Sequence, residues 1–223
     1  MGETGSLPLF LLGSVLFPGM LLPLHIFEPR YRLMLQRSLQ ADAPFGIVLI
    51  KSGVEVGGSA EPHHVGTTAR VVGTTPLPGG RSFIIARGER RFEIDRVDAE
   101  SEPYLVGEVR YLEEDPGNDP AAESLADRTA DAYGQYLTGM LATSTDAHSE
   151  LPLGELREGT PADVSYRIAG GLGIDALERQ RLLETDRTGA RLESVLRLLE
   201  RENTLLSMLI ARLRARGEGP TLN

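Results

Sequence analysis

The sequence has 223 residues, 41% of them hydrophobic, and a net charge of −9, so it suits a folded protein of one large or two small domains. It contains no cysteine, which excludes disulfides, thiolate metal sites and a cysteine nucleophile and is typical of a reducing, cytoplasmic location. The net negative charge argues against binding to nucleic acid or to an anionic membrane through bulk charge.

An uncharged apolar stretch runs from Leu7 to Phe27 and is long enough to span a membrane. Three prolines argue against a span, because each would leave backbone groups unpaired in lipid: Pro8, Pro18 and Pro23. A signal peptide does not fit either, because Glu3 stands where a basic segment is required. The stretch therefore predicts a buried part of a folded core.

Within this stretch the pattern predicts two short buried strands, residues 7–12 and 20–26, on either side of a turn. Pro18 sets φ for the first corner of a type II turn, and Gly19 accepts the positive φ that follows. A helix is predicted over residues 29–39, because it begins at a proline and carries apolar side chains at helical spacing.

Short strand patterns continue as far as residue 112. Further strands are expected at 45–50, 66–75, 82–86, 92–95 and 105–111. Gly88 is expected to break or bulge the strand that contains it, and residues 52–62 read as a loop. Six or seven short strands with one early helix predict a curled antiparallel sheet or small pseudo-barrel.

The apolar period changes after an acidic segment, and the rest of the chain reads as helical. Helices are expected at 120–141, 161–169, 175–183 and 188–215. Asp119 and Thr160 each precede a proline, which is typical of a capped helix start. The sequence thus predicts an α+β protein. Its expected parts are a flexible start at 1–6, a β domain at 7–112, a linker at 113–119, a helical bundle at 120–216 and a flexible tail at 217–223.

The last predicted helix carries a wide apolar stripe. Its leucines recur every seven residues at Leu192, Leu199, Leu206 and Leu213, and further apolar side chains widen the stripe beyond a two-stranded coiled-coil seam. Burial within its own bundle is the favoured interpretation, and an interface between copies is the alternative. We therefore expect a monomer or a weak homo-oligomer.

Residues that could carry catalysis lack supporting spacing. Lys51 is the only lysine, and Ser52 beside it would point to the opposite face of a strand, which argues against a Ser–Lys dyad. The pair His63-His64 lacks the spacing of a metal site. A triad would rest on one Gly-rich loop, which does not hold such geometry: Ser59, Glu61 and His64. We expect no catalytic residue, no cofactor and no metal.

Four arginines form a local basic cluster: Arg87, Arg90, Arg91 and Arg96. Small barrels can bind nucleic acid through basic residues, together with aromatic side chains on which the bases stack. Acidic residues interleave with the arginines and few aromatic residues are available, so a charge-paired strand edge is favoured. No nucleic-acid partner is expected.

Several motifs together resemble the N-terminal, substrate-binding domain of Lon proteases. They are FPGMLLPL at 17–24 with IFEPRYR at 26–32, VGTTARV at 65–71, RGERRFEI at 87–94, YLVGEV at 104–109 and ERQRLLE at 178–184. The resemblance covers about residues 7–214 and is greatest to the stand-alone bacterial form of this domain. It implies a PUA-like curled β domain followed by a helical bundle.

The same resemblance implies a non-catalytic module that holds unfolded or tagged polypeptide for a separate ATP-dependent protease. The 223 residues contain no Gly-x-x-x-x-Gly-Lys-Ser/Thr loop that would cradle ATP. The opening stretch and a hairpin supply the predicted polypeptide contacts: Phe17, Met20, Phe45, Leu77 and Pro78. Two alternatives stay open, namely a Lon-like peptidase and a scaffold whose acidic helical part docks one partner.

Overall fold

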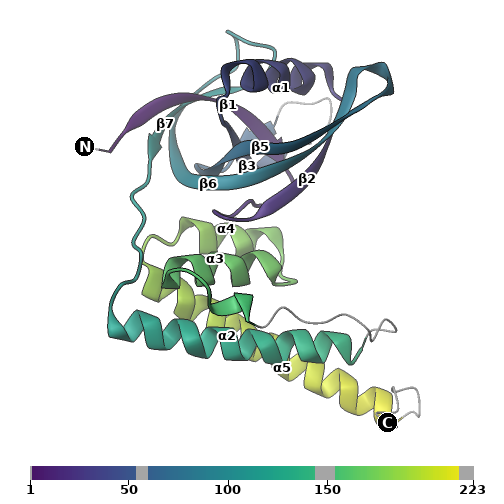
Figure 1. The fold of residues 1–223 in the computed structure, drawn as a ribbon, viewed down its shortest axis with the longest axis vertical. Coiled ribbons are helices and arrows are strands. Elements are labelled where there is room, and N and C mark those ends of the chain that lie inside the picture. The colour runs from purple at the N-terminus through teal and green to yellow at the C-terminus, as the bar shows by residue number, and fades with distance from the viewer. Residues whose placement is uncertain (1, 54–59, 144–153, 216–223) are drawn as a thin grey trace. The chain divides into compact units, whose positions relative to one another are not determined.

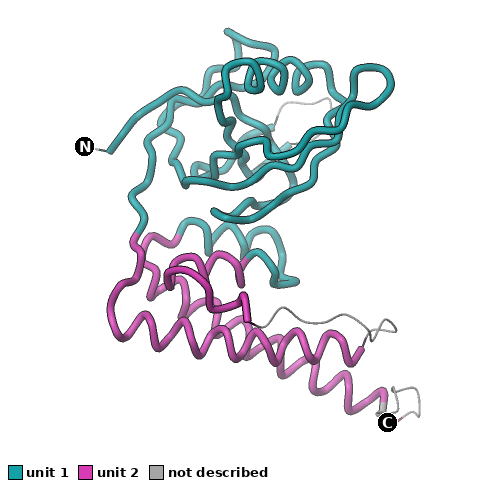
Figure 2. Tube along the Cα trace, in the orientation of Figure 1, with its two compact units in different colours: residues 1–114, 170–184 teal, residues 115–169, 185–223 magenta. Residues whose placement is uncertain are grey.

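The computed structural model of the chain describes residues 2–53, 60–143 and 154–215 (Figure 1). By its contacts the chain divides into two compact units, residues 1–114 with 170–184 and residues 115–169 with 185–223 (Figure 2). We call them the β unit and the helical unit. Among the described helices, none is long and apolar enough to cross a membrane.

The β unit holds a seven-stranded curled sheet with helix α1 (Pro29–Ala41) lying over it (Figure 1). The strands are β1 (Thr4–Leu12), β2 (Leu21–Ile26), β3 (Phe45–Gly53), β4 (Ala60–Pro62), β5 (Val65–Leu77), β6 (Arg81–Asp98) and β7 (Val106–Tyr111). Their order is β1-β7-β6-β5-β3-β4, with β2 beside β6. The α+β class and the curled, mainly antiparallel sheet are confirmed.

One pairing departs from the antiparallel prediction. Residues 9–12 of β1 pair in parallel with residues 46–49 of β3, so β1 joins both β7 and β3. The two strands of the opening stretch, β1 and β2, therefore have different partners, since β2 pairs with β6. The predicted turn between them is present: Gly19 has φ 78°, and the Met20 N–H donates to the Phe17 carbonyl at 3.1 Å.

The continuous apolar pattern of β1 is explained by burial on both faces of the strand. Leu7, Leu9 and Leu11 pack in one core cluster with Phe92. Phe10 and Leu12, which point to the other side of β1, pack in a second cluster. Their neighbours there come from α1 and β3: Tyr31, Met34 and Phe45. A strand buried on both faces reads as an unbroken apolar run rather than an alternating one.

A second helix, α4 (Ala176–Glu184), groups with the β unit, whereas the predicted limits place it in the helical bundle. The Gln180 side-chain amide donates to the Val65 carbonyl at 2.9 Å, and the Arg91 guanidinium donates to the Leu183 carbonyl at 2.9 Å. Both side chains are buried, so α4 is held by polar contacts that its own apolar pattern does not reveal.

The helical unit is built on α2 (Pro120–Leu141) and α5 (Thr188–Ala215), with the short η2 (Glu155–Arg157) and most of α3 (Pro161–Gly171). The predicted caps are confirmed. The Asp119 carboxylate accepts from two N–H groups of the first turn of α2, each at 3.0 Å. Thr160 and Asp163 cap α3 reciprocally, with the Thr160 N–H donating to the Asp163 carboxylate at 2.8 Å.

The apolar stripe of α5 has two parts with different surroundings. Leu192, Val195 and Leu199 are fully buried, as the bundle interpretation predicts. Asn203, further along, donates to the Ala132 carbonyl of α2 at 3.0 Å and fixes how the two helices align. Beyond it Leu206, Ile210 and Leu213 of the stripe are half-buried, whereas Leu205 and Leu209 are exposed, so the stripe is fully buried only in its first half.

Asp115 ties the segment before α2 to the N-terminus of α5. Its carboxylate accepts from the Thr188 N–H at 2.9 Å and from the Gly117 N–H at 3.0 Å. These backbone hydrogen bonds, that of Thr188 first, hold the pKa of Asp115 below its ordinary value of 3.8. Because the pKa of Asp115 is lower in the folded state than in the unfolded state, these contacts stabilise the fold fully at pH values above the unfolded-state pKa. The stabilisation is lost as the pH falls through the folded-state pKa.

We therefore expect Asp115→Ala to lower the free energy of unfolding by about 1 kcal/mol at neutral pH, a modest effect because the side chain is exposed. The difference from the wild type should shrink below about pH 4. Urea unfolding followed by circular dichroism at neutral pH and at about pH 3 measures it. A difference that stays constant across this range would contradict the assignment.

Candidate functional site

Lys51 and Ser52, the two residues considered for a Ser–Lys dyad, both bond the carboxylate of Glu61. Lys51 Nζ lies 2.9 Å from Glu61 Oε1, and the Ser52 hydroxyl donates to Glu61 Oε2 at 3.1 Å. The prediction that Lys51 and Ser52 point apart is therefore wrong, because a register shift between Ile50 and Ser52 interrupts the alternation of β3. The hydrogen bond from the Lys51 ammonium lowers the pKa of Glu61. Both side chains are exposed, whereas a lysine that acts as a catalytic base must be shielded from water.

The histidines diverge. His63 Nδ1 lies 3.7 Å from Glu184 Oε1 of α4, whereas His64 is exposed and its carbonyl accepts from the Ile94 N–H. Ser59, the third residue of the suggested triad, lies outside the described residues. Over the described ranges no group of three or more His, Asp or Glu side chains is arranged to hold a metal ion.

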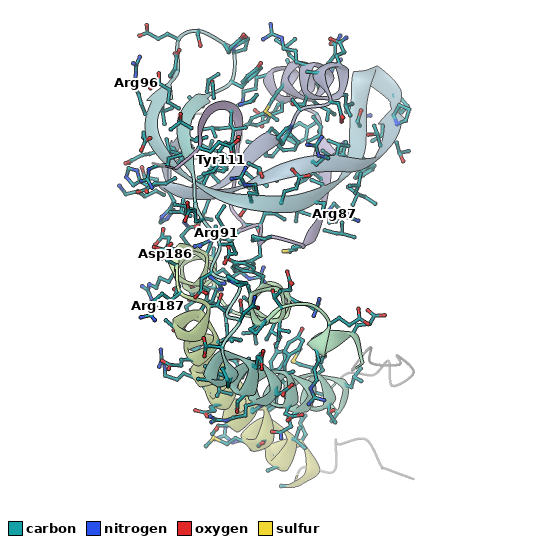
Figure 3. The ribbon with its side chains drawn as sticks, turned by 60° about the vertical axis from the view of Figure 1, so that its left-hand side comes forward. Arg87, Arg91, Arg96, Tyr111, Asp186 and Arg187 are labelled. Carbon is teal, nitrogen blue, oxygen red and sulfur yellow. The ribbon has the colours of Figure 1, made fainter. Side chains whose placement is uncertain are left out.

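The four arginines of the basic cluster are dispersed. Arg91 is buried and contacts Glu114 at 3.2 Å, whereas Arg90 pairs with Glu3 at 2.8 Å. Figure 3 shows Arg87 and Arg96 on opposite sides of the β unit. The predicted charge pairing is present at Arg90 and Arg96, but the burial of Arg91 was not foreseen.

The predicted polypeptide contacts have different surroundings. Phe17 and Phe45 are core side chains with exposed fractions of 0% and 1%. Such side chains cannot contact a partner without unpacking the core, so we leave both out of the candidate surface. Met20 and Leu77 are half-buried, and Pro78 is exposed in the turn η1 (Pro78–Gly80). A binding role for these three stays a prediction.

Large apolar side chains gather instead on the outer surface of β2 and β6. Leu21, Phe27, Phe83 and Ile85 are 52%, 44%, 51% and 44% exposed. In the ladder between the strands, Pro23 lies opposite Ile85 and His25 lies opposite Phe83. We define the β2–β6 face by these outward side chains: Leu21, Pro23, His25, Phe27, Phe83 and Ile85.

Strand alternation and ring packing hold this face in place. The neighbouring residues Ile84 and Ala86 are buried in the core, so Phe83 and Ile85 must point outward. The His25 ring centroid lies 4.8 Å from that of Phe83 and 5.5 Å from that of Phe27. An antiparallel sheet usually has one polar, solvated face, so strands that are apolar on both faces indicate an interaction surface.

A pocket of about 240 Å³ adjoins the face beside β2. Residues of β1 and α1 line it together with three residues of the face, Pro23, His25 and Phe27. The sheet pairs β2 with β6 alone, so the other edge of β2 carries no strand among the described residues. Pro23 lacks an N–H and blunts that edge, which favours contact through side chains over addition of a further strand.

The sequence pattern does not predict this face, because the apolar run at residues 20–26 is typical of a buried strand. The signal that could have found it is Pro23, since proline within a strand marks an edge. The second signal is the run Phe83-Ile84-Ile85, which places apolar residues on both faces of β6.

A family model of the ATP-dependent protease La (LON) substrate-binding domain matches residues 6–201. The Lon protease of Xanthomonas oryzae pv. oryzae is 28% identical over 193 residues, which are 84% of this chain and 22% of that protein. The Lon protease of Anaeromyxobacter dehalogenans is 28% identical over 200 residues, 87% of this chain and 23% of that protein. The chain thus spans about a fifth of the length of these curated relatives.

Two solved structures have a similar fold. A Lon N-terminal domain protein from Xanthomonas campestris has a TM-score of 0.62 and 30% identity, over 86% of this chain and 97% of that chain. The N-terminal domain of Mycobacterium avium complex Lon protease has a TM-score of 0.65 at 17% identity, over 90% of this chain and 98% of that chain. The chain therefore belongs to the ATP-dependent protease La (LON) substrate-binding domain family.

Proposed function

We propose that this chain is a non-catalytic recognition module that binds unfolded or tagged polypeptide segments through the β2–β6 face. The observation that carries the proposal is the contiguity of four large apolar side chains that are each 44–52% exposed. Exposed apolar groups of this kind lower solubility unless a partner covers them. Membership of a substrate-binding domain family supports the same role.

The geometry suits recognition that tolerates many sequences. The outward side chains at Leu21 and Phe83 offer apolar area, and the only polar group on the face is the His25 imidazole. An extended segment places alternate side chains on one side, so it can lay apolar residues across two adjacent strands. The pocket beside Pro23 offers room for one further apolar side chain.

A module of this kind holds a segment and leaves its cleavage to another protein. In our proposal that partner is a separate ATP-dependent protease, and the two meet in the cytoplasm. The described contacts of Lys51 agree with a module that does not cleave, since its ammonium is exposed to solvent and pairs with an exposed carboxylate, whereas a lysine base needs a dry site.

We expect Phe83→Ser combined with Ile85→Ser to weaken binding to a labelled, permanently unfolded polypeptide by tenfold or more. The variant loses two apolar side chains, and burying each of them against the polypeptide contributes at most about 1.5–3 kcal/mol to binding. Fluorescence anisotropy of the label measures the affinity. Val97→Ser is the matched control, since Val97 is an exposed apolar residue of the same strand outside the face. It should bind like the wild type.

A gel of the same samples, with and without ATP and a divalent metal ion, reports cleavage. Intact polypeptide with weakened binding only in the face variant supports the proposal. Cleavage by the wild type would favour the peptidase alternative, and its loss in Lys51→Ala would locate the chemistry. Absence of both binding and cleavage would leave the scaffold alternative.

A further inference from the structure

We propose that the β2–β6 face selects apolar segments that are flanked on both sides by Asp or Glu. This inference rests on the proposed function and names the class of segment that the face prefers. It follows from the charges at the two ends of the face.

The parts of the chain that form the face and its immediate surroundings carry no acidic residue, although β6 has acidic residues further along, from Glu89 onward. Residues 20–27 and 70–88 contain no Asp or Glu, although the chain has 32 acidic residues and a net charge of −9. Arg81 and Arg87 are both exposed and lie at the same outward positions of β6 as Phe83 and Ile85. One arginine therefore stands at each end of the apolar group, roughly 20 Å apart along an extended strand.

Over the described ranges, no carboxylate neutralises these two arginines. Arg81 donates to the Pro78 carbonyl at 3.0 Å, and no carboxylate pairs with it among the described residues. Arg87 has no ion pair or side-chain hydrogen bond within the described part of the chain. Other exposed arginines of the sheet differ, since Arg70 lies 2.7 Å from Glu89 and Arg96 lies 3.7 Å from Glu108.

The acidic residues next to the face are already engaged. Glu89, two residues after Arg87, pairs with Arg70, and Glu28, which lines the pocket, pairs with Arg30 at 3.0 Å. The ends of the face therefore present positive charge on an acidic protein. A bound segment with carboxylates at both ends would pair with it, and a segment with lysines would be repelled.

Three peptides test the preference. They share one apolar core of about six residues and carry Asp, Ser or Lys on both sides of it. We expect the Asp-flanked peptide to bind about three- to tenfold more tightly than the Ser-flanked one, because two exposed ion pairs form. The Lys-flanked peptide should bind most weakly, and the three affinities should converge at about 0.5 M salt.

Variants locate the selecting charges. Arg81→Glu combined with Arg87→Glu should reverse the order of the three peptides. Arg90→Glu combined with Arg96→Glu is the matched control, because it changes the net charge equally on the same strand, at arginines that already pair with Glu3 and Glu108. Figure 3 shows Arg96 on the opposite side of the β unit from Arg87. This control should keep the order of the wild type.

The outcomes separate this inference from the function on which it rests. Equal binding of all three peptides at low salt would overturn the acidic preference and leave polypeptide binding intact. A preference unchanged in the Arg81→Glu, Arg87→Glu variant would also overturn it, since the charge would lie elsewhere. Failure of every peptide to bind would contradict the proposed function itself.

Discussion

Replacement of Arg191 by alanine should lower the free energy of unfolding of the helical unit by about 3–5 kcal/mol. The Arg191 side chain is fully buried, and its Nε donates to the Ser165 hydroxyl at 2.7 Å. Its Nη1 donates to the Thr185 carbonyl at 2.6 Å and its Nη2 to the Thr188 hydroxyl at 2.9 Å. The guanidinium also lies 3.9 Å from the centre of the Tyr166 ring.

The size of this effect follows from what the substitution leaves behind. Alanine would leave a cavity and would remove the donor from three acceptors, the Ser165 and Thr188 hydroxyls and the Thr185 carbonyl, and each lost hydrogen bond from a charged donor costs about 1–3 kcal/mol. Denaturant unfolding followed by circular dichroism measures the loss. Arg197→Ala is the control, because Arg197 is exposed on the same helix and donates, among the described residues, a single side-chain hydrogen bond, to the Ser194 hydroxyl at 2.9 Å. Equal stability of the two variants would contradict the role of Arg191.

The Gly88→Ala variant should lose at least about 3 kcal/mol of stability, with most of the protein unfolded or insoluble. A Cβ at Gly88 would lie 2.2 Å from the Phe17 carbonyl oxygen, which is backbone and cannot move aside like a side chain. The Gly88 N–H and carbonyl also bond the Met20 carbonyl and the Gly19 N–H, each at 2.9 Å. These bonds hold β6 against the turn that leads into β2.

Gly73→Ala is the matched control for this effect. A Cβ at Gly73 would meet its nearest atoms at 3.7 Å, an ordinary van der Waals distance, so this variant should fold with a melting temperature close to that of the wild type. The soluble yield and the melting temperature of both variants measure the difference. Similar behaviour of the two would show that the close approach at Gly88 is not a constraint.

The Gly88 contact also links stability to the proposed binding surface. Because the turn at 17–20 fixes where β2 begins, a shift there moves Leu21 relative to Ile85 and disrupts the β2–β6 face. Any Gly88→Ala protein that remains soluble should therefore bind unfolded polypeptide less well. Gly73→Ala should bind normally, which separates this loss from a general effect of adding a methyl group.

Local signals were enough to predict many elements of this chain. The helices Pro120–Leu141 and Thr188–Ala215 have the predicted limits, because caps, prolines and the apolar period lie within a few residues of each helix end. The turn at Pro18-Gly19 follows from the φ preferences of those two residues. The register shift expected near Gly88 is also present, between Thr67 and Ala69 of the partner strand.

Features that depend on distant partners were decided only by the tertiary structure. The parallel pairing of β1 with β3, the burial of Arg91 and the grouping of α4 with the sheet all join residues that are far apart in the chain. The exposed β2–β6 face belongs with them. A strand that is apolar on both sides has the same sequence pattern whether one face or both are buried, and only the packing of the other elements decides which side chains stay open to solvent.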